Sequence, residues 1–181
     1  MDTIAANNLM NRIRDGDDKA LKEFYEIYGR KIFVTAYYMT QNYHDAQDVQ
    51  SIVLGKFWFD RFKYIDNLGG LVYTVTSRTA LNYIRDNKKH RRSLSYGEEV
   101  DRKAVTFEFT EQDLAVNDVL DMLSEKEREV VLRHVLFGDT FREISKDMKI
   151  PRTTAQIAHL RALKKLQDRC VKIYPQGDTN E

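Results

Sequence analysis

The sequence is nearly free of cysteine and has no long apolar run, and each absence excludes a class of protein. The single cysteine, Cys170, leaves no pair for a disulfide framework and no cluster for a cysteine-bound metal. No apolar stretch approaches the roughly 18–20 residues that a membrane helix needs. The first residues are polar and lack the apolar core of a secretion signal. We therefore expect a cytoplasmic protein with no membrane insertion.

Glycine and proline are also scarce, with 8 and 2 residues in a chain of 181. Folds with many short strands need frequent turns, and these two residues form a large share of them. A chain of this length holds one large or two small domains. The composition predicts an all-α protein. The patterns below divide it into two helical domains, residues 1–92 and 112–181, joined by an acidic linker at residues 93–111.

The net charge of +1 conceals an uneven distribution. Residues 78–92 carry six Lys or Arg and one acid, and residues 142–172 carry nine Lys or Arg and three acids. Between them, residues 93–121 carry eight acids and two bases. Phosphate contacts need local rather than overall positive charge. The two basic patches are compatible with nucleic-acid binding, although a run of charge is also typical of an ordinary solvent-exposed face.

The first domain has the periodicity of packed helices. Asp17 can cap a helix, which Gly29 is expected to end before a second, aromatic-rich helix. A third helix is predicted from about Asp45, and a turn at residues 66–70 precedes a fourth helix from about Leu71. The third helix is expected to bury one face made of Val49, Ile52, Val53 and Phe57. The fourth is expected to pack through Val72, Val75, Thr79 and Tyr83.

The helical period is lost over residues 93–111, where serine, glycine and acidic residues are mixed. Residues 105–109 alternate apolar and polar side chains, as a short strand does. No partner strand is evident, and an isolated strand is not stable. This segment is interpreted as the linker.

The last third shows helix, turn and helix in close succession. Ser124 and Thr140 each stand three residues before a glutamate, which is the pattern of a capping box. Pro151 suits the approach to a final basic helix, which Thr153 or Thr154 is expected to cap. A short helix followed by a tight turn and a longer basic helix is the helix-turn-helix arrangement. Such a motif places the first turn of its second helix at base edges in the major groove, although capped helical hairpins also occur in proteins that bind no DNA.

Several short motifs in one order resemble the extracytoplasmic-function (ECF) sigma factors of bacterial RNA polymerase. Residues 123–132 (LSEKEREVVL), 138–145 (GDTFREIS) and 161–166 (RALKKL) are similar to region four of that family. Residues 45–49 (DAQDV), continuing to Trp58, and residues 80–85 (ALNYIR) are similar to region two. The resemblance covers roughly residues 8–170. It implies a sigma factor that binds core RNA polymerase, recognises a specific promoter and assists DNA opening.

The resemblance also implies roles for residues of the first domain. The helix at residues 45–58 corresponds to the family's contact with core polymerase, with Asp48, Ser51 and Ile52 as candidates. The aromatic-basic segment 57–64 and the fourth helix correspond to the part that binds the minus-ten element, although Phe57, Trp58 and Phe62 also have the spacing of core residues. The minus-ten candidates are Arg61, Lys63, Tyr64, Thr74, Ser77, Arg78, Asn82, Arg85, Lys88 and Lys89.

In the second domain, the final helix corresponds to the family's reader of the minus-thirty-five element. The candidates there are Arg152, Thr153, Thr154, Gln156, Arg161, Lys164 and Lys165. This chain has Gln156 and Ala158 where relatives often carry Lys and Arg, and Ile157, Leu160 and Leu163 add apolar surface. Either the promoter sequence is unusual or part of this helix packs on a partner. In the family that partner is typically an anti-sigma factor.

Three alternatives compete with this interpretation. A helix-turn-helix regulator that works without polymerase would share the second domain but would leave the aromatic-basic segment unexplained. A helical interaction module would need both basic patches to be solvent faces. An enzyme is disfavoured because the four histidines lack metal-binding spacing and no glycine-rich phosphate loop exists. We therefore expect no catalytic residues, no metal and no cofactor.

Overall fold

The computed structural model describes residues 2–59, 65–93 and 120–173, and these residues form helices without any strand. The chain divides into two compact units, Met1–Thr110 and Glu111–Glu181. The all-α prediction with two helical domains is confirmed. Most of the predicted linker, including the alternating stretch at residues 105–109, lies outside the described residues.

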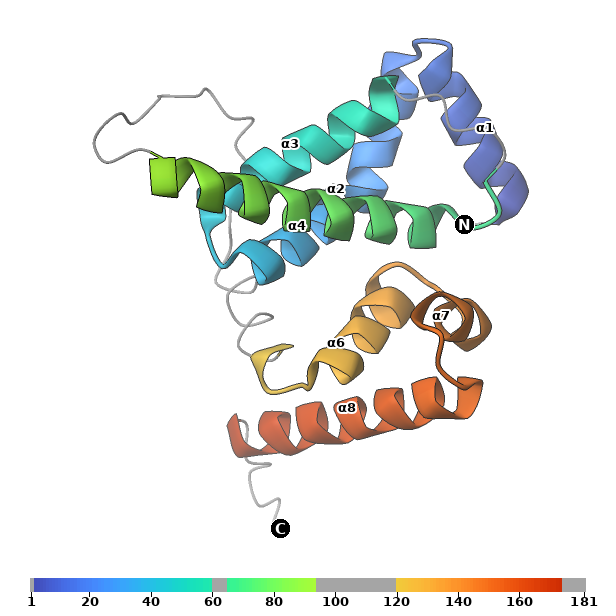
Figure 1. The fold of residues 1–181 in the computed structure, drawn as a ribbon. Coiled ribbons are helices and arrows are strands. Elements are labelled where there is room, and N and C mark those ends of the chain that lie inside the picture. The colour runs from blue at the N-terminus through green and yellow to red at the C-terminus, as the bar shows by residue number, and fades with distance from the viewer. Residues whose placement is uncertain (1, 60–64, 94–119, 174–181) are drawn as a thin grey trace, which may run out of the picture. The chain divides into compact units, whose positions relative to one another are not determined.

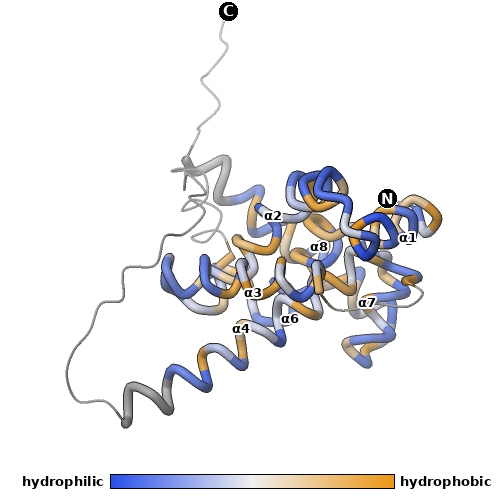
Figure 2. The backbone as a smooth tube through the Cα atoms, turned by 90° about the horizontal axis from the view of Figure 1, so that it is seen from above, coloured by the Kyte–Doolittle hydropathy of each residue, from blue (hydrophilic) through white to orange (hydrophobic). Residues whose placement is uncertain are grey.

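The first unit contains α1 (Thr3–Arg14), α2 (Asp18–Thr40), α3 (Tyr43–Phe59) and α4 (Leu68–Ser93). Helices α2, α3 and α4 pack against one another (Figure 1). Their core is rich in aromatic and branched side chains, and its fully buried members include Phe24, Phe33, Phe57, Ile32, Val49, Val53 and Val72. Along α4, apolar and polar stretches alternate, as expected for a helix with one buried face (Figure 2).

Polar side chains fix where these helices begin. As predicted, the Asp17 carboxylate caps α2 by accepting from the backbone N–H of Lys19 at 2.9 Å. The amide oxygen of Asn42 accepts from the N–H of Asp45 at 3.0 Å, so Asn42 rather than Asp45 caps α3. Asn67 does the same for α4, accepting from the N–H of Gly70 at 3.0 Å.

Three sequence predictions for this unit were wrong in detail. Helix α2 continues through Gly29, which is buried because the Tyr25 ring packs where a β-carbon would stand. Helix α4 begins at Leu68 rather than near Leu71. Ile52 was expected on the buried face of α3, but it is 42% exposed, because a helix of 3.6 residues per turn places only part of an apolar stripe against the core.

The second unit contains α6 (Glu125–Val131), a π-helical turn η1 (Leu132–Leu136), α7 (Phe141–Met148) and α8 (Arg152–Ile173). Both predicted capping boxes are present, Ser124 with Glu127 and Thr140 with Glu143. The predicted caps of α8 were wrong. The carbonyl of Pro151 accepts from the N–H of Ala155, so Thr153 and Thr154 already lie in the first turn.

Candidate nucleic-acid interface

The outer face of α4 carries exposed polar side chains over a buried apolar face. Arg78, Asn82 and Arg85 are exposed, whereas Val72 and Ala80 are buried. The Arg85 guanidinium lies 3.5 Å from the Asp86 carboxylate, and both side chains are largely exposed, so this ion pair contributes little stability. Among the described residues of this unit, the face exposes cationic and amide groups that suit a phosphate backbone or base edges.

Two predicted DNA-reading residues of α4 are less available to DNA than the others. The Thr74 hydroxyl donates to the carbonyl of Gly70 at 2.8 Å, which is a bond within the helix. The Ser77 hydroxyl oxygen is buried and has no hydrogen-bond partner among the residues that the structure describes. Of the α4 candidates, therefore, Arg78, Asn82 and Arg85 project most freely. Arg61, Lys63 and Tyr64, and the side chains of Lys88 and Lys89, lie outside what the structure describes.

Helix α3 holds α4 through side-chain hydrogen bonds. The Lys56 ammonium donates to the Thr79 hydroxyl at 2.8 Å, and the Tyr83 hydroxyl donates to the Asp48 carboxylate at 2.5 Å. Burial, together with the charge of the Asp48 carboxylate, raises the pKa of Tyr83 to about 12. Asp48, a predicted contact for core polymerase, is therefore half-buried and bonded to α4.

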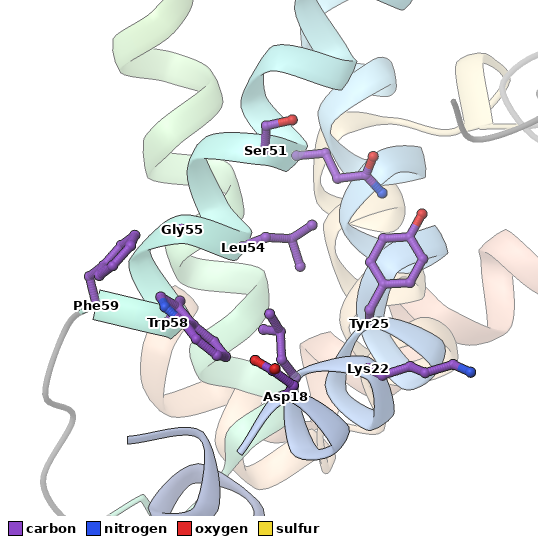
Figure 3. A pocket seen from close by; sticks show the side chains of 10 residues that line it. Asp18, Lys22, Tyr25, Ser51, Leu54, Gly55, Trp58 and Phe59 are labelled. Atoms are coloured by element: carbon purple, nitrogen blue, oxygen red, sulfur yellow. The ribbon is translucent and has the colours of Figure 1, made fainter. Parts of the chain in front are cut away.

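An apolar groove of about 480 Å³ runs between α2 and α3. Leu54 and Trp58 of α3 face Tyr25 and Lys22 of α2 across it, with Asp18 at one end (Figure 3). The predicted polymerase contact Ser51 also lines this groove. Trp58 was expected to be a core residue, but it is only half-buried and forms the groove wall. Phe57, in contrast, is buried as expected.

The segment before α4 is braced by α1, which sequence reasoning missed. The side-chain amide of Asn7 donates to the carbonyl of Ile65 at 2.7 Å and accepts from the N–H of Ile65 at 3.0 Å. The Thr3 hydroxyl donates to the carbonyl of Asp66 at 3.1 Å. These bonds join residues about sixty positions apart in the chain, so no local sequence signal could have indicated them.

In the second unit, α7 and α8 form the predicted helix-turn-helix. Lys149 adopts a left-handed conformation that ends α7, and Ile144, Ala155 and Ala158 meet Val130 of α6 in a small core. Ala158 was noted as a departure from relatives that carry a basic residue there, and here it is buried. Its small side chain allows α8 to pack closely on α6 and α7.

A buried ion-pair network stabilises the helix-turn-helix. The Arg133 guanidinium lies 2.6 Å from the Asp139 carboxylate and 2.7 Å from that of Asp147 on α7. Arg133 and Asp139 are almost wholly buried. Because the Arg133 guanidinium binds a carboxylate on each side, the network links the π-helical turn to α7.

The outer face of α8 contains most of the predicted minus-thirty-five residues. Arg152, Thr153, Arg161 and Lys164 are exposed, and Thr154 and Gln156 are half-buried. Lys165 is different, because its ammonium lies 2.7 Å from the Glu127 carboxylate on α6. This ion pair and the N–H of Ser124 lower the pKa of Glu127 to about 2. Lys165 thus holds α8 against α6.

Two histidines flank the start of α7. The His134 ring stacks on Phe141 and its Nδ1 donates to the carbonyl of Asp139 at 2.7 Å. The His159 ring packs edge-on against both His134 and Phe141. Burial and the neighbouring His134 lower the pKa of His159. No group of three metal-binding side chains gathers within residues 2–59, 65–93 and 120–173.

Within the same three ranges, no helix combines the length and the hydropathy needed to cross a membrane. Comparison with known families gives two matches in sequence order. The model of Sigma-70 region 2 matches residues 24–90, and the model of Sigma-70 region 4 matches residues 113–166. The first match spans most of α2, all of α3 and most of α4, and the second spans α6, α7 and most of α8.

Comparison with solved structures gives 17 similar chains. One of them, the structure of CnrH in complex with the cytosolic domain of CnrY, is 15% identical with a TM-score of 0.60. The match covers 92% of this chain and 97% of that chain. At this identity the likeness concerns the fold. No curated protein sequence matches the chain significantly.

Proposed function

Because the chain belongs to the sigma-70 family and is a sigma factor of the ECF type, we propose that its two regions divide promoter recognition between them. Residues 1–92 would bind core polymerase and the minus-ten element, and residues 112–181 would bind the minus-thirty-five element. Residues 93–111 would link them. The observation that carries this proposal is that both family regions occur in order, each with a basic helix that exposes its outer face.

We propose that core polymerase binds along the exposed side of α3 and the groove beside it. Ser51 lines this groove and Ile52 stands exposed next to it, so both are available to a partner. Leu54 and Trp58 supply apolar surface of the kind that protein interfaces bury. Asp48 lies on the same helix, half-buried and bonded to Tyr83, and would contribute its negative charge.

For the minus-ten element, we propose α4 as the reading helix. Arg78 and Asn82 are exposed on the same face, one helical turn apart, and Arg85 continues it. Arg61, Lys63, Tyr64, Lys88 and Lys89 remain candidates for phosphate and base contacts, since interleaved aromatic and basic residues suit unpaired DNA. Thr74 and Ser77 remain weaker proposals because of their internal placement.

For the minus-thirty-five element, we propose that the N-terminal half of α8 enters the major groove. Arg152, Thr153, Thr154 and Gln156 lie in or next to its first turn. The positive end of the helix dipole favours phosphate there. Arg161 and Lys164 follow on the exposed side and would contact the backbone, whereas Lys165 would reach DNA only by leaving Glu127.

We further propose that the protein acts in the cytoplasm, has no catalytic activity of its own and is held inactive by an anti-sigma factor. The similarity in fold to a protein solved in complex with a second protein supports such a partner. The exposed apolar side chains of α3 and α8 are surfaces that a partner can cover.

Reconstitution tests the proposal. The full chain mixed with core RNA polymerase should co-elute with it and start transcription at specific promoters. Arg78→Ala should lower promoter opening about tenfold while leaving core binding unchanged, since the side chain is exposed on the DNA-facing helix. Arg14→Ala, an exposed change on α1, is the matched control. Tight binding to duplex DNA without any association with core enzyme would contradict the proposal.

A further inference from the structure

The outer face of α8 is apolar at the place where a DNA-reading helix is expected to be polar. Ile157 is 48% exposed and Leu160 is 64% exposed. Both line a groove of about 490 Å³, together with Phe141, Thr153, Gln156 and His159. Exposed side chains of this size arranged in a stripe indicate a surface that something covers.

This stripe does not belong to the core of the domain. The core-facing side of α8 is formed by Ala155, Ala158 and Ala162, which are all buried. Residues 157 and 160 lie on the opposite side of the helix, where Phe141 of α7 lines the groove with them and about half or more of each side chain is exposed. A large part of their apolar surface is therefore left without a packing role in the described part of the unit.

Positive charges surround the stripe and indicate what covers it. Arg152 precedes Gln156 by one helical turn, and Arg161 and Lys164 follow Ile157 and Leu160 by one turn each. All three basic side chains are exposed. An apolar strip between cations matches the major groove of DNA, where thymine methyl groups lie between two rows of phosphates.

Each side chain of the strip then matches one feature of an A·T base pair. The amide of a glutamine can donate to N7 and accept from N6 of adenine in paired fashion, and aliphatic side chains contact the C5-methyl group of thymine. Guanine, in contrast, is read best by arginine or lysine. The strip consists of Gln156, Ile157 and Leu160, so it offers one amide and two aliphatic groups to the DNA, and the cations lie at its borders.

We infer that Gln156, Ile157 and Leu160 make this sigma factor select A·T pairs in its minus-thirty-five element. Gln156 recognises an adenine, and Ile157 and Leu160 recognise thymine methyl groups. Arg152, Arg161 and Lys164 bind the flanking phosphates and add affinity without base preference. This inference rests on the proposed function, because it requires α8 to enter the major groove.

The test begins with the holoenzyme formed by the full chain and core polymerase. Selection from promoters randomised in the minus-thirty-five element should return A·T pairs at neighbouring positions. Replacing each selected thymine by deoxyuridine removes only the methyl group. This change should weaken binding about fourfold per contacted methyl, the factor expected for exposing one such group.

Variants of the strip assign the effect to its residues. Ile157→Ala and Leu160→Ala should each lose sensitivity to one deoxyuridine replacement, and because both side chains are exposed, folding should be preserved. Leu163→Ala is the matched control, since Leu163 is 43% exposed but lies farther along α8 and outside the groove. Gln156→Arg should change one selected adenine to guanine, with a preference of about tenfold.

The outcomes separate this inference from the proposed function. Formation of an active holoenzyme that selects G·C pairs, or that ignores deoxyuridine, would overturn the A·T assignment and leave the sigma function intact. Loss of binding to a protein partner, with unchanged promoter selection in Ile157→Ala and Leu160→Ala, would likewise overturn it and identify a protein-binding surface. Failure to form a holoenzyme at all would overturn both.

Discussion

The two helices proposed to face DNA have different surfaces. Helix α4 exposes arginine and asparagine around Leu81, whereas α8 exposes isoleucine and leucine with basic residues at the edges. A mainly basic and polar face can follow a phosphate backbone and meet unpaired bases. A strip made of Gln156, Ile157 and Leu160 distinguishes base pairs through thymine methyl groups and one side-chain amide. The comparison suggests that the two regions read different features of a promoter.

The interactions that hold α4 and α8 in place also differ. Helix α4 is held by the hydrogen bond that Lys56 of α3 donates to Thr79 and by the one that Tyr83 donates to Asp48 of α3. Helix α8 packs through alanines and is held by the Lys165–Glu127 ion pair, over the buried Arg133 network. Removing one charge from a buried pair costs more than removing a neutral hydrogen-bond donor. Helix α8 should therefore be more sensitive than α4 to substitutions of the residues that hold it in place.

The largest effect is expected at Arg133. Arg133→Met would leave the Asp139 carboxylate buried without its cation, and we expect the second unit to lose about 3–5 kcal/mol in free energy of unfolding. Denaturant unfolding followed by circular dichroism measures this loss. The double variant Arg133→Met with Asp139→Asn removes the unpaired charge and should recover part of it. If Arg142→Met, an exposed change, cost as much, the buried network would not be the cause.

A smaller effect is expected for the hydrogen bond beneath α4. Tyr83→Phe should lower the stability of the first unit by about 1–2 kcal/mol, because it removes a bond to the Asp48 carboxylate. The folded-state pKa of Tyr83 is about 12, above the ordinary value of 10.0, so its contribution is fully present below pH 10 and disappears as the pH rises through 12. The stability difference between the wild type and Tyr83→Phe should shrink over that range.

A double-mutant cycle assigns this bond to its two partners. Asp48→Ala and Tyr83→Phe should not be additive, because each removes the same interaction. If core binding falls in Asp48→Ala but not in Tyr83→Phe, Asp48 contacts polymerase directly. Additive losses of stability would contradict the role of the bond.

The elements that sequence predicted well were those with local signals. Ser124 and Thr140 correctly predicted where their helices begin, because a capping box needs only residues three positions apart. Gly29 was wrongly predicted to end a helix, because a glycine that accommodates a neighbouring ring looks the same in sequence as one that ends a helix. Ile52 was wrongly predicted to be buried, because apolar periodicity does not show where the core ends.

The candidate interface was predictable only in part. The exposure of Arg78 and Arg161 followed from helical periodicity. The internal use of Asp48 and Lys165 did not, because their partners lie 35 and 38 positions away and pair only once the helices have packed. The groove wall formed by Trp58 was missed because the spacing of aromatic residues favoured the core.

The ion pair that holds α8 should give an effect of about 1 kcal/mol. Glu127→Gln keeps an oxygen for the capping box and loses the charge that faces Lys165. The pKa of Glu127 is lowered to about 2 from an ordinary 4.5, so its charge stabilises the fold above pH 4.5, and this contribution is lost as the pH falls through 2. The stability difference between the wild type and Glu127→Gln should therefore shrink steadily from pH 4.5 through pH 2. A difference that stays constant over this range would show that packing, and not charge, separates the two proteins.

The smallest effect is expected at Gly55 on α3. A β-carbon at this position would meet nothing within 4 Å, so Gly55→Ala should stabilise the first unit by about 0.5–1 kcal/mol through the helix preference of alanine. The added methyl group also narrows the groove between α2 and α3, which Gly55 lines. If polymerase uses this groove, Gly55→Ala should weaken core binding although it stabilises the fold.

Gly29→Ala is the contrasting control, because its β-carbon would stand 3.0 Å from the Tyr25 ring and should destabilise the protein. Unchanged core affinity in a stabilised Gly55→Ala protein would mean that polymerase binds elsewhere, and the comparison of the two DNA-facing helices would stand without this groove.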